Sequence, residues 1–431
     1  MAKSNKKNQS VAVIGLGYVG LPVALRALEQ GYITYGLDLD KKKLSAIKSG
    51  RSPFKESFIE KRKALLKKIK VSDKPTILKK ADIVVVCVPT PVDEQFYPIL
   101  EPLKSAVSFI AKNNRPGQLV IIESTINPGI CEDVVVPIFT QAGLKEKKDY
   151  FLAHCPERID PGNPKWNIVN IPRVLGAVSA QGLSKTKKFY ASLIDAPIKP
   201  MRSIREAEAV KIIENSFRDI NIAFVNELAK SFDKMNIDVK NVIDGAATKP
   251  FAFMPHYPGR GVGGHCIPVD PYYLIQKAKE IGFDHKFLRI AREINNSMPI
   301  YTVEILQDLL NELEMPMKRT HVGVMGLSYK ANVDDLRESP SLKIIEELKR
   351  KKANIIRFDP FLKNMSDVPD LKNLLKKSDA LILVTNHQMF LDIDPQTFRK
   401  NNIRAIVDGM NCLNKNKIKR LGIKYRGIGS R

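Results

Sequence analysis

The sequence predicts an α/β fold in which two Rossmann-like domains, each with a doubly wound parallel sheet, flank a central helical domain with one long helix. Three observations support this prediction. Short apolar runs alternate with helical patterns up to residue 202, as expected for parallel strands covered by helices. Residues 203–235 contain no Gly or Pro and carry apolar residues at helical spacing. The alternating pattern returns at residue 318, so we expect domains at 1–202, 203–317 and 318–431.

The first domain opens with a short apolar run at residues 11–14, which reads as a buried parallel strand. A helical pattern follows and stops at Gly31, a residue type that commonly ends helices. A second strand is expected to end at Asp38. Further strands are expected at 83–88, 119–123, 150–154 and 174–178.

A glycine-rich turn joins the first expected strand to the first helix. Gly15, Gly17 and Gly20 form a Gly-x-Gly-x-x-Gly pattern, and Asp38 ends the next strand. Such glycines allow a tight turn, close approach of a pyrophosphate and close helix packing, while the acidic residue binds the ribose hydroxyls. The pattern therefore predicts a dinucleotide site. Asp38 favours NAD because it would repel the 2′-phosphate of NADP, although the nearby cations Lys41–Lys43 leave some tolerance for that phosphate open.

The last domain repeats features of the first. Residues 322–329 resemble residues 11–18, and residues 376–384 resemble residues 79–86. Ser328 stands where the first copy has its second glycine, so this backbone cannot approach a pyrophosphate as closely. We expect only the first half to hold a dinucleotide.

The chain is strongly basic, with a formal net charge of +24. Its lysines are spread along the whole length, and a basic stripe interleaved with aromatic residues, as nucleic-acid binding needs, is not visible. The charge is better explained by a lysine-rich surface that attracts an anionic cofactor and substrate. We therefore expect no nucleic-acid partner.

The lengths of the apolar runs and the spacing of the cysteines indicate the cellular compartment. No apolar run approaches the roughly 20 residues needed to cross a bilayer, so no membrane partner is expected. The five cysteines are scattered and form no Cys-x-x-Cys pair, which favours a reducing compartment over a disulfide framework or a zinc site. We expect a cytoplasmic protein without a bound metal.

The most informative segment is the glycine-rich stretch before Cys266. Four glycines between residues 259 and 264 place this thiol beside backbone that a ligand can approach, and Asp270 follows one helical turn later. A lone cysteine is usually a small buried apolar residue, which is how we interpret Cys87 and Cys131. Metal binding by His265 with Cys266 is disfavoured, because adjacent residues rarely chelate one ion. Cys266 is therefore our candidate nucleophile.

Seven ordered motifs resemble the UDP-glucose/GDP-mannose dehydrogenase family over nearly the full chain. They are Gly15–Gly20 with Asp38, Val88–Pro91, Glu123–Gly129, Pro156–Arg158, Ala207–Lys211 with Asn215, the Cys266 loop, and Gly326–Lys330 leading to Arg337–Pro340. The resemblance implies an NAD-binding domain, a helical dimerisation core and a C-terminal domain that binds the nucleotide of a UDP-sugar. A homodimer or a higher homo-oligomer is then expected.

Within the family the chain is most similar to the UDP-N-acetylglucosamine 6-dehydrogenases of polysaccharide synthesis. The segments that carry this similarity are residues 156–163, 249–255 and 264–271. Many UDP-glucose enzymes have a second Glu four residues after the first, but here that position is Pro161. Asp160 is a candidate substitute.

The resemblance implies a four-electron oxidation of the C6 hydroxymethyl group, with a thiohemiacetal and then a thioester on Cys266. Lys211 and Asn215 would stabilise the oxyanion, and Asp270 would polarise a water or orient Lys211. Glu157 would serve as the base in thioester hydrolysis, and Thr125 would hold that water near the nicotinamide. The expected cofactor-binding residues are Gly15, Gly17, Tyr18, Val19, Gly20, Asp38, Lys43, Thr90, Thr125 and Arg337. The expected substrate-binding residues are Glu157, Arg158, Lys211, Asn215, Tyr257, Arg260, Gly263 and Lys330.

Three alternatives remain open. The same chemistry on UDP-N-acetylmannosamine, UDP-N-acetylgalactosamine or UDP-glucose is the nearest. A two-electron β-hydroxyacid dehydrogenase also joins a dinucleotide domain to a long helix that carries a Lys, but it needs neither the Cys266 loop nor the second α/β half. A catalytically silent sensor of NAD or nucleotide sugars would not need Lys211, Asn215, Cys266 and Asp270 together.

Overall fold

A computed structural model describes residues 9–54, 56–93, 95–159, 163, 165–264 and 266–430. These residues form two compact units. One comprises Met1–Glu214 with Gln276–Ile281, and the other comprises Asn215–Ile275 with Gly282–Arg431. Three residues named above, Asp160, Pro161 and His265, lie outside the described residues.

The first unit is built on an eight-stranded sheet, counted over its described residues, in the order β3-β2-β1-β4-β5-β6-β7-β8. Its strands are β1 (Ser10–Ile14), β2 (Ile33–Leu37), β3 (Lys70–Ser72), β4 (Ile83–Val86), β5 (Gln118–Ile122), β6 (Tyr150–His154), β7 (Arg173–Ala177) and β8 (Ile198–Pro200). Neighbouring strands are parallel except for the antiparallel pair β6–β7. The strand order reverses between β1 and β4, which creates the crevice where doubly wound sheets bind ligands.

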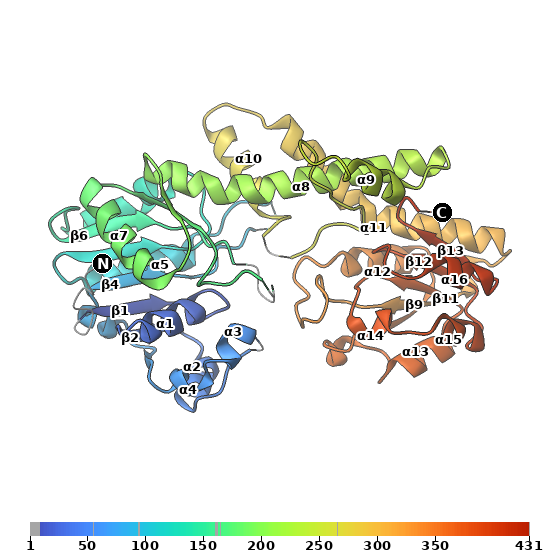
Figure 1. Ribbon diagram of the computed structural model, residues 1–431, viewed down its shortest axis with the longest axis horizontal. Coiled ribbons are helices and arrows are strands. Elements are labelled where there is room, and N and C mark those ends of the chain that lie inside the picture. Colours follow the sequence, from blue (N-terminus) through green and yellow to red (C-terminus); the bar gives the residue numbers. More distant parts are fainter. Residues whose placement is uncertain are drawn as a thin grey trace. The chain divides into compact units, whose positions relative to one another are not determined.

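Helices cover both faces of this sheet (Figure 1). The helices of this unit are α1 (Gly20–Glu29), α2 (Lys41–Lys48), α3 (Ser57–Glu60), α4 (Lys63–Leu66), η2 (Pro75–Lys80), α5 (Glu101–Lys112), η3 (Cys131–Val135), α6 (Val136–Gln141) and α7 (Ala180–Leu193). Of these, α3 and α4 pack on α1. Alternate residues of β1 enter different apolar cores: Val11 and Val13 pack in one, Ala12 and Ile14 in the other. Because both faces of β1 are buried, its sequence is a continuous apolar run.

The long helix expected at 203–235 is α8, Ile204–Lys234, drawn in light green in Figure 1. It is followed by α9 (Val239–Ala246), α10 (Asp270–Glu280) and α11 (Lys286–Glu312). Three large apolar side chains of α8 are exposed: Ile213, Phe217 and Phe224. Their spacing of four and seven residues places them along one stripe of the helix.

The C-terminal sheet has five parallel strands among the described residues, in the order β10-β9-β11-β12-β13. The strands are β9 (His321–Met325), β10 (Asn354–Phe358), β11 (Ala380–Leu383), β12 (Ala405–Asp408) and β13 (Lys424–Gly427). The helices are η4 (Met317–Arg319), α12 (Pro340–Arg350), η5 (Lys363–Met365), α13 (Leu371–Lys377), α14 (Gln388–Leu391), α15 (Pro395–Lys400) and α16 (Lys415–Arg420). β9 pairs with β10 and β11 as β1 pairs with β2 and β4, so the expected repeat is present in the topology. Among the described residues, no helix has the length and apolar character required to cross a membrane.

Candidate active site

The three glycines after β1 meet different surroundings. Gly15 has a φ of +87°, and a side chain there would overlap the Cys87 carbonyl oxygen. A side chain at Gly20 would overlap the Gly15 carbonyl oxygen, so this glycine lets α1 begin against the turn. At Gly17 a Cβ atom would meet nothing within 4 Å. Gly15 and Gly20 are thus required by the fold. Gly17 instead leaves open space beside the start of α1, as a bound pyrophosphate needs.

Asp38 lies directly after β2 at the same edge of the sheet. Its Oδ2 accepts hydrogen bonds from the Leu16 amide and the Lys43 ammonium group, each at 2.7 Å. Partial burial alone would raise the pKa of Asp38, but the hydrogen bonds from Lys43 and the Asp40 and Leu16 amides outweigh it and lower that pKa. The carboxylate is therefore ionised and held at the place where a ribose would bind. Lys43 pairs with it directly.

Other expected cofactor residues surround this edge. Tyr18, which is 37% exposed, packs against Phe54 with ring centroids 4.2 Å apart, and Val19 directly precedes α1. The Thr90 hydroxyl donates to the Thr125 carbonyl oxygen at 2.7 Å, so the structure brings these two threonines together. With the open space at Gly17 and the ionised Asp38, the residues of this edge fit a dinucleotide.

Glu157 follows β6 and is buried. Its Oε1 accepts from the Arg158 amide at 2.6 Å and also from the Ile159 amide. Its Oε2 lies 3.5 Å from the Arg173 guanidinium group. The Arg158 side chain itself forms an ion pair with Glu214 at 2.5 Å.

The thiol loop and α8 meet in the second unit. The Asn215 amide nitrogen donates to Asp270 Oδ2 at 2.5 Å. Asp270 is buried at the start of α10, and its own amide donates to the Cys266 carbonyl oxygen at 2.8 Å. The structure therefore brings Asn215, Asp270 and the Cys266 backbone together. Lys211 is half-buried and lies one turn before Asn215 on α8.

The Cys266 loop is held by several backbone contacts. The Gly259 amide donates to the buried Asn226 side chain at 2.9 Å, and the Gly264 amide donates to the Arg337 carbonyl oxygen at 3.1 Å. A Cβ atom at Gly263 would lie 2.8 Å from atoms of Glu338, Pro340 and Tyr329. From the sequence, these glycines were expected only to allow close approach of a ligand. The structure gives Gly263 and Gly264 a packing role as well, because a side chain at either position would crowd Tyr329.

Two arginines near this loop differ in their partners. Arg337 pairs with Asp335 at 2.6 Å, and this hydrogen bond, helped by charge interactions that include Cys266, raises the pKa of Arg337. Arg260 is buried, and its guanidinium group donates to the carbonyl oxygens of Tyr329 at 3.1 Å and Gly261 at 3.5 Å. Its Nε finds no acceptor among the described residues, and burial lowers the pKa of Arg260 to about 10. Among the described residues this buried cation contacts carbonyl oxygens and no carboxylate, which suits an anionic ligand.

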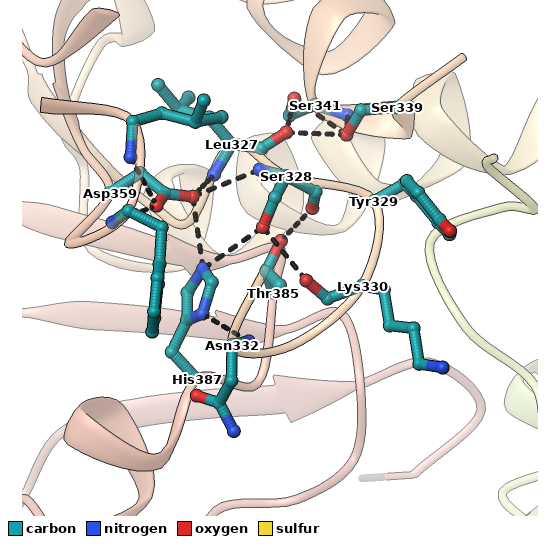
Figure 2. Close-up of polar contacts among 12 residues, drawn as sticks. Leu327, Ser328, Tyr329, Lys330, Asn332, Ser339, Ser341, Asp359, Thr385 and His387 are labelled. Atoms are coloured by element: carbon teal, nitrogen blue, oxygen red, sulfur yellow. Dashed lines mark hydrogen bonds and ion pairs between the residues drawn. The ribbon is translucent and has the colours of Figure 1, made fainter. Parts of the chain in front are cut away.

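In the C-terminal sheet, the residue that corresponds to Asp38 is differently engaged (Figure 2). Asp359 Oδ2 accepts from the Leu327 and Ser328 amides at 2.7 and 3.0 Å, and from His387 Nε2 at 3.0 Å. His387 Nδ1 accepts from the Asn332 amide at 2.9 Å, which places the ring proton on Nε2. Asp359, Ser328 and His387 are fully buried. This carboxylate is therefore unavailable to a ribose.

Lys330 and Tyr257 were expected to bind substrate. Ser328 Oγ donates to the Lys330 carbonyl oxygen at 3.0 Å, which fixes the Lys330 backbone to the buried network. In Figure 2 the Lys330 side chain points away from that network. The Tyr257 hydroxyl, in an exposed position, donates to Asp244 at 2.8 Å.

Comparison with known proteins addresses the family directly. Residues 9–194, 205–297 and 323–415 match, in turn, the NAD binding domain, the central domain and the UDP binding domain of the UDP-glucose/GDP-mannose dehydrogenase family. The chain belongs to this family. It is therefore an NAD-dependent dehydrogenase of nucleotide sugars, and its cofactor is NAD.

Two relatives illustrate the range within the family. A UDP-N-acetyl-D-mannosamine dehydrogenase of Pyrococcus horikoshii is 35% identical over 97% of this chain and 99% of the relative. A UDP-N-acetyl-D-glucosamine 6-dehydrogenase of Pseudomonas aeruginosa is 34% identical over 91% of this chain and 94% of the relative. The solved structure of UDP-D-ManNAc dehydrogenase from P. horikoshii has a TM-score of 0.91 at 34% identity, with 98% of this chain and 99% of that chain covered.

In this dehydrogenase, the assignment of the two sheets to NAD and UDP binding agrees with the different environments of Asp38 and Asp359. The NAD-binding region contains Asp38, and the UDP-binding region contains the buried Asp359. Sequence reasoning missed two anchoring groups. The Glu208 carboxylate accepts from the Gly129 and Cys131 amides at 2.5 and 2.9 Å, and Arg173 lies fully buried beside Glu157. Glu208 stood within a recognised motif, whereas the strand sequence around Arg173 carried no signal of burial.

Proposed function

We propose that this enzyme oxidises the C6 hydroxymethyl group of UDP-N-acetylglucosamine to the carboxylate, through a covalent intermediate on Cys266. The observation that carries the chemistry is the contact of Asn215 with Asp270 beside the Cys266 backbone. The second candidate substrate is UDP-N-acetylmannosamine, which is favoured by the relative that is 35% identical over almost the whole chain. The two sugars differ in configuration at one carbon, so the same residues would perform the same reaction.

NAD, bound along Gly17 and Asp38, would accept the electron pairs that leave C6. The chain's residues supply the rest. The Cys266 thiolate adds to the C6 aldehyde, so a C–S bond forms and the carbonyl oxygen becomes an oxyanion. Loss of a hydride from C6, which carries the second electron pair, converts the oxyanion of this thiohemiacetal to the thioester carbonyl. Because the carbon stays attached to Cys266, a free aldehyde is not released.

The negative charge that develops on the oxygen would be stabilised by Lys211 and Asn215, and Asp270 would orient these two side chains. A cation and an amide donor aimed at a developing oxyanion are the groups that stabilise it best. The hydrogen bond from Asn215 to the buried Asp270 fixes the orientation of both side chains. This rigidity supports their assignment to catalysis, because groups that need no rearrangement during the reaction stabilise its transition state most effectively.

Glu157 would act in the hydrolytic step. A water attacks the thioester carbonyl and gives a proton to Glu157, and the C–S bond then breaks to release the carboxylate and return the Cys266 thiolate. The two amides that bind Glu157 Oε1 orient the carboxylate. Thr125, whose backbone carbonyl is held by Thr90, would help to position the water.

The nucleotide would be bound largely by the second unit. Arg260 is a buried guanidinium group without a carboxylate partner among the described residues, which supports a contact with the diphosphate. Lys330 adds a second cation, while Tyr257 and Gly263 would line the sugar pocket. We further propose a homodimer that pairs the exposed apolar stripe of α8.

The decisive experiment is a panel of UDP-N-acetylglucosamine, UDP-N-acetylmannosamine, UDP-N-acetylgalactosamine and UDP-glucose with NAD. We expect about two NADH for each UDP-N-acetylglucosamine consumed, and a product that has gained one oxygen and lost two hydrogens. A preference for another sugar would reassign the substrate. One NADH per sugar would contradict the four-electron reaction.

The covalent route is tested by Cys266→Ser with Cys412→Ser as its control. Cys412 is half-buried, and its thiol contacts Asp408 at 3.7 Å, where a hydroxyl can substitute. We expect the control to form carboxylate at the parent rate and Cys266→Ser to form none. Carboxylate formation by both variants would rule out the thioester.

A further inference from the structure

A buried polar cluster lies at the carboxyl edge of the first sheet, behind Glu157. Glu123 directly follows β5, Glu157 follows β6, and Arg173 is the first residue of β7. Glu123 is 1% exposed, Glu157 7% and Arg173 0%. Three ionisable side chains thus share a site that excludes solvent.

The hydrogen bonds of the two carboxyl groups differ. Glu123 Oε1 accepts from the Tyr190 hydroxyl, and the Cys87 thiol approaches Oε2 at 3.7 Å. Glu157 is bound by two backbone amides and lies 3.5 Å from Arg173. Glu157 therefore accepts from backbone amides and lies beside a cation, whereas Glu123 is contacted by a phenol and a thiol.

Among the described contacts of this cluster, the one guanidinium group is that of Arg173. Only part of its hydrogen-bonding capacity is used. Its Nη1 reaches the Pro156 carbonyl oxygen at 3.4 Å and Glu157 at 3.5 Å, while Nε and Nη2 have no acceptor among the described residues. Its charge also acts on Glu123, and the guanidinium carbon lies 5.8 Å from the centre of the Tyr190 ring. One cation thus serves two carboxyl groups.

Charge balance favours one proton on the pair. With both carboxyl groups ionised the buried cluster would carry a net negative charge, which is costly in a site without solvent. Burial, joined by the negative charge of Glu157, raises the pKa of Glu123 to about 7, although Arg173, Tyr190 and Cys87 act in the opposite direction. Cys155 follows β6 and also lies close to this cluster; burial raises its pKa well above the usual range, so it stays a neutral thiol.

We propose that Glu123 is a positioning residue that shares Arg173 with Glu157 and holds the one proton of the pair, so that Glu157 alone carries negative charge. The link to catalysis rests on the proposed role of Glu157 as base. A protonated Glu123 leaves the guanidinium charge to Glu157 and keeps that carboxylate oriented.

The proton can be observed without substrate. Infrared titration of the enzyme should show the C=O stretch of a buried protonated carboxyl group at pH 6 that disappears as the pH rises through neutrality. We expect Glu123→Gln to lack this transition. Glu208→Gln is the matched control, because Glu208 is a second buried carboxyl group of the same unit whose partners are the Gly129 and Cys131 amides. It should retain the transition.

Two further variants should shift the midpoint pH of this infrared titration in opposite directions. Glu157→Gln removes the neighbouring negative charge and should lower the midpoint by about one pH unit or more. Tyr190→Phe removes a donor to the Glu123 carboxylate and should raise the midpoint. These shifts are read from an intact Glu123, so they decide the question even if Glu123→Gln does not fold. An unchanged midpoint in Glu157→Gln, or a transition that persists in folded Glu123→Gln, would overturn the proposal.

The effect on turnover is tested separately. We expect kcat of the parent enzyme to change through an ionisation near neutral pH that is absent in Glu123→Gln, with kcat below that pH within about threefold of the parent. Identical profiles of kcat against pH for the parent and Glu123→Gln would show that Glu123 has no role in the reaction. A failed substrate panel with a successful infrared titration would instead reject the proposed function and keep the shared proton.

Discussion

At the scale of single residues, the candidate site depends on a few contacts that orient side chains. Asp270 is joined to Asn215 on α8 by its side chain and to Cys266 by its backbone. The Cys266 loop is held in turn by Asn226, which contacts Asn295 of α11 at 2.9 Å. The position of the thiol loop is therefore determined by two helices that begin and end far from it in the sequence.

Asn215→Asp tests the contact with Asp270. The substitution places two carboxyl groups at the 2.5 Å contact, where they can remain only by sharing a proton. We expect kcat to fall by roughly 10²–10³, as for the loss of one oxyanion donor, and the loss to grow as the pH rises. The control is Asn221→Asp, because Asn221 lies on the same helix and bonds only the Phe217 carbonyl oxygen among the described contacts. Equal kcat values for both variants would contradict the catalytic assignment.

Residue types and spacing predicted part of the site. The turn glycines and Asp38 could be placed from sequence because backbone geometry requires particular residues at fixed spacing. Arg173 could not be found, because its partner Glu157 lies on another strand and only the fold brings them together. The roles assigned to Cys266, Lys211 and Glu157 stay predictions that the experiments above test.

At the scale of elements, the same strand–turn–helix unit occurs twice with different chemistry. After β1 the turn leaves open space at Gly17, whereas after β9 Ser328 is buried and bonds His387 at 3.2 Å. The sequence predicted this difference from one substitution. It did not predict the interactions of Asp359, because His387 lies 28 residues further along the chain.

The two turn glycines should respond differently to alanine. At Gly15 alanine must adopt a positive φ and meets the Cys87 carbonyl, so we expect destabilisation by about 1–3 kcal/mol. At Gly17 the added methyl group has space in the protein, so stability should change little while NAD binding weakens. Thermal unfolding and NAD titration of both variants measure this. Unchanged NAD affinity in Gly17→Ala would show that the cofactor does not approach this turn.

His387→Ala tests the buried network of the second sheet. Removing the imidazole leaves Asp359 without one donor and should reduce the free energy of unfolding at pH 7 by about 1–3 kcal/mol. The pKa of Asp359 is lowered, because hydrogen bonds from His387 and the Leu327 and Ser328 amides outweigh the opposing effect of burial.

The lowered pKa of Asp359 determines how the stability of the protein should depend on pH. A lowered folded-state pKa gives stability that is fully present above the unfolded-state pKa of about 3.9 and is lost as the pH falls toward the folded-state value. His387→Ala should bring the two pKa values closer together, so its stability should decline less than the parent's between pH 5 and pH 3. Urea unfolding across that range measures the difference. Parallel pH curves would show that His387 does not stabilise the ionised Asp359.

At the scale of the whole molecule, the sequence predicted the α/β class, the repeat and α8 almost to the residue, because apolar periodicity and glycine turns are local signals. It did not predict that β6 and β7 are antiparallel, since strand direction depends on the connection between them. Nor did it show that the middle of the chain shares a core with the last sheet. Val225 and Leu306 pack in the same apolar cluster as Val322 and Ile344.

The remaining prediction concerns the exposed stripe of α8. Phe217 is 48% and Phe224 53% exposed, and large apolar side chains at helical spacing on a surface are typical of an interface. If two copies pair through this stripe, Phe217→Glu would bury a charge on each side of the contact. We expect the parent enzyme to sediment as a dimer or larger assembly and Phe217→Glu to sediment as a smaller species. Arg218→Gln, an adjacent exposed position with the same change of one charge unit, should keep the parent assembly. An unaltered assembly in Phe217→Glu would place the interface elsewhere, because burying a charge on each side of a contact between two copies opposes their association.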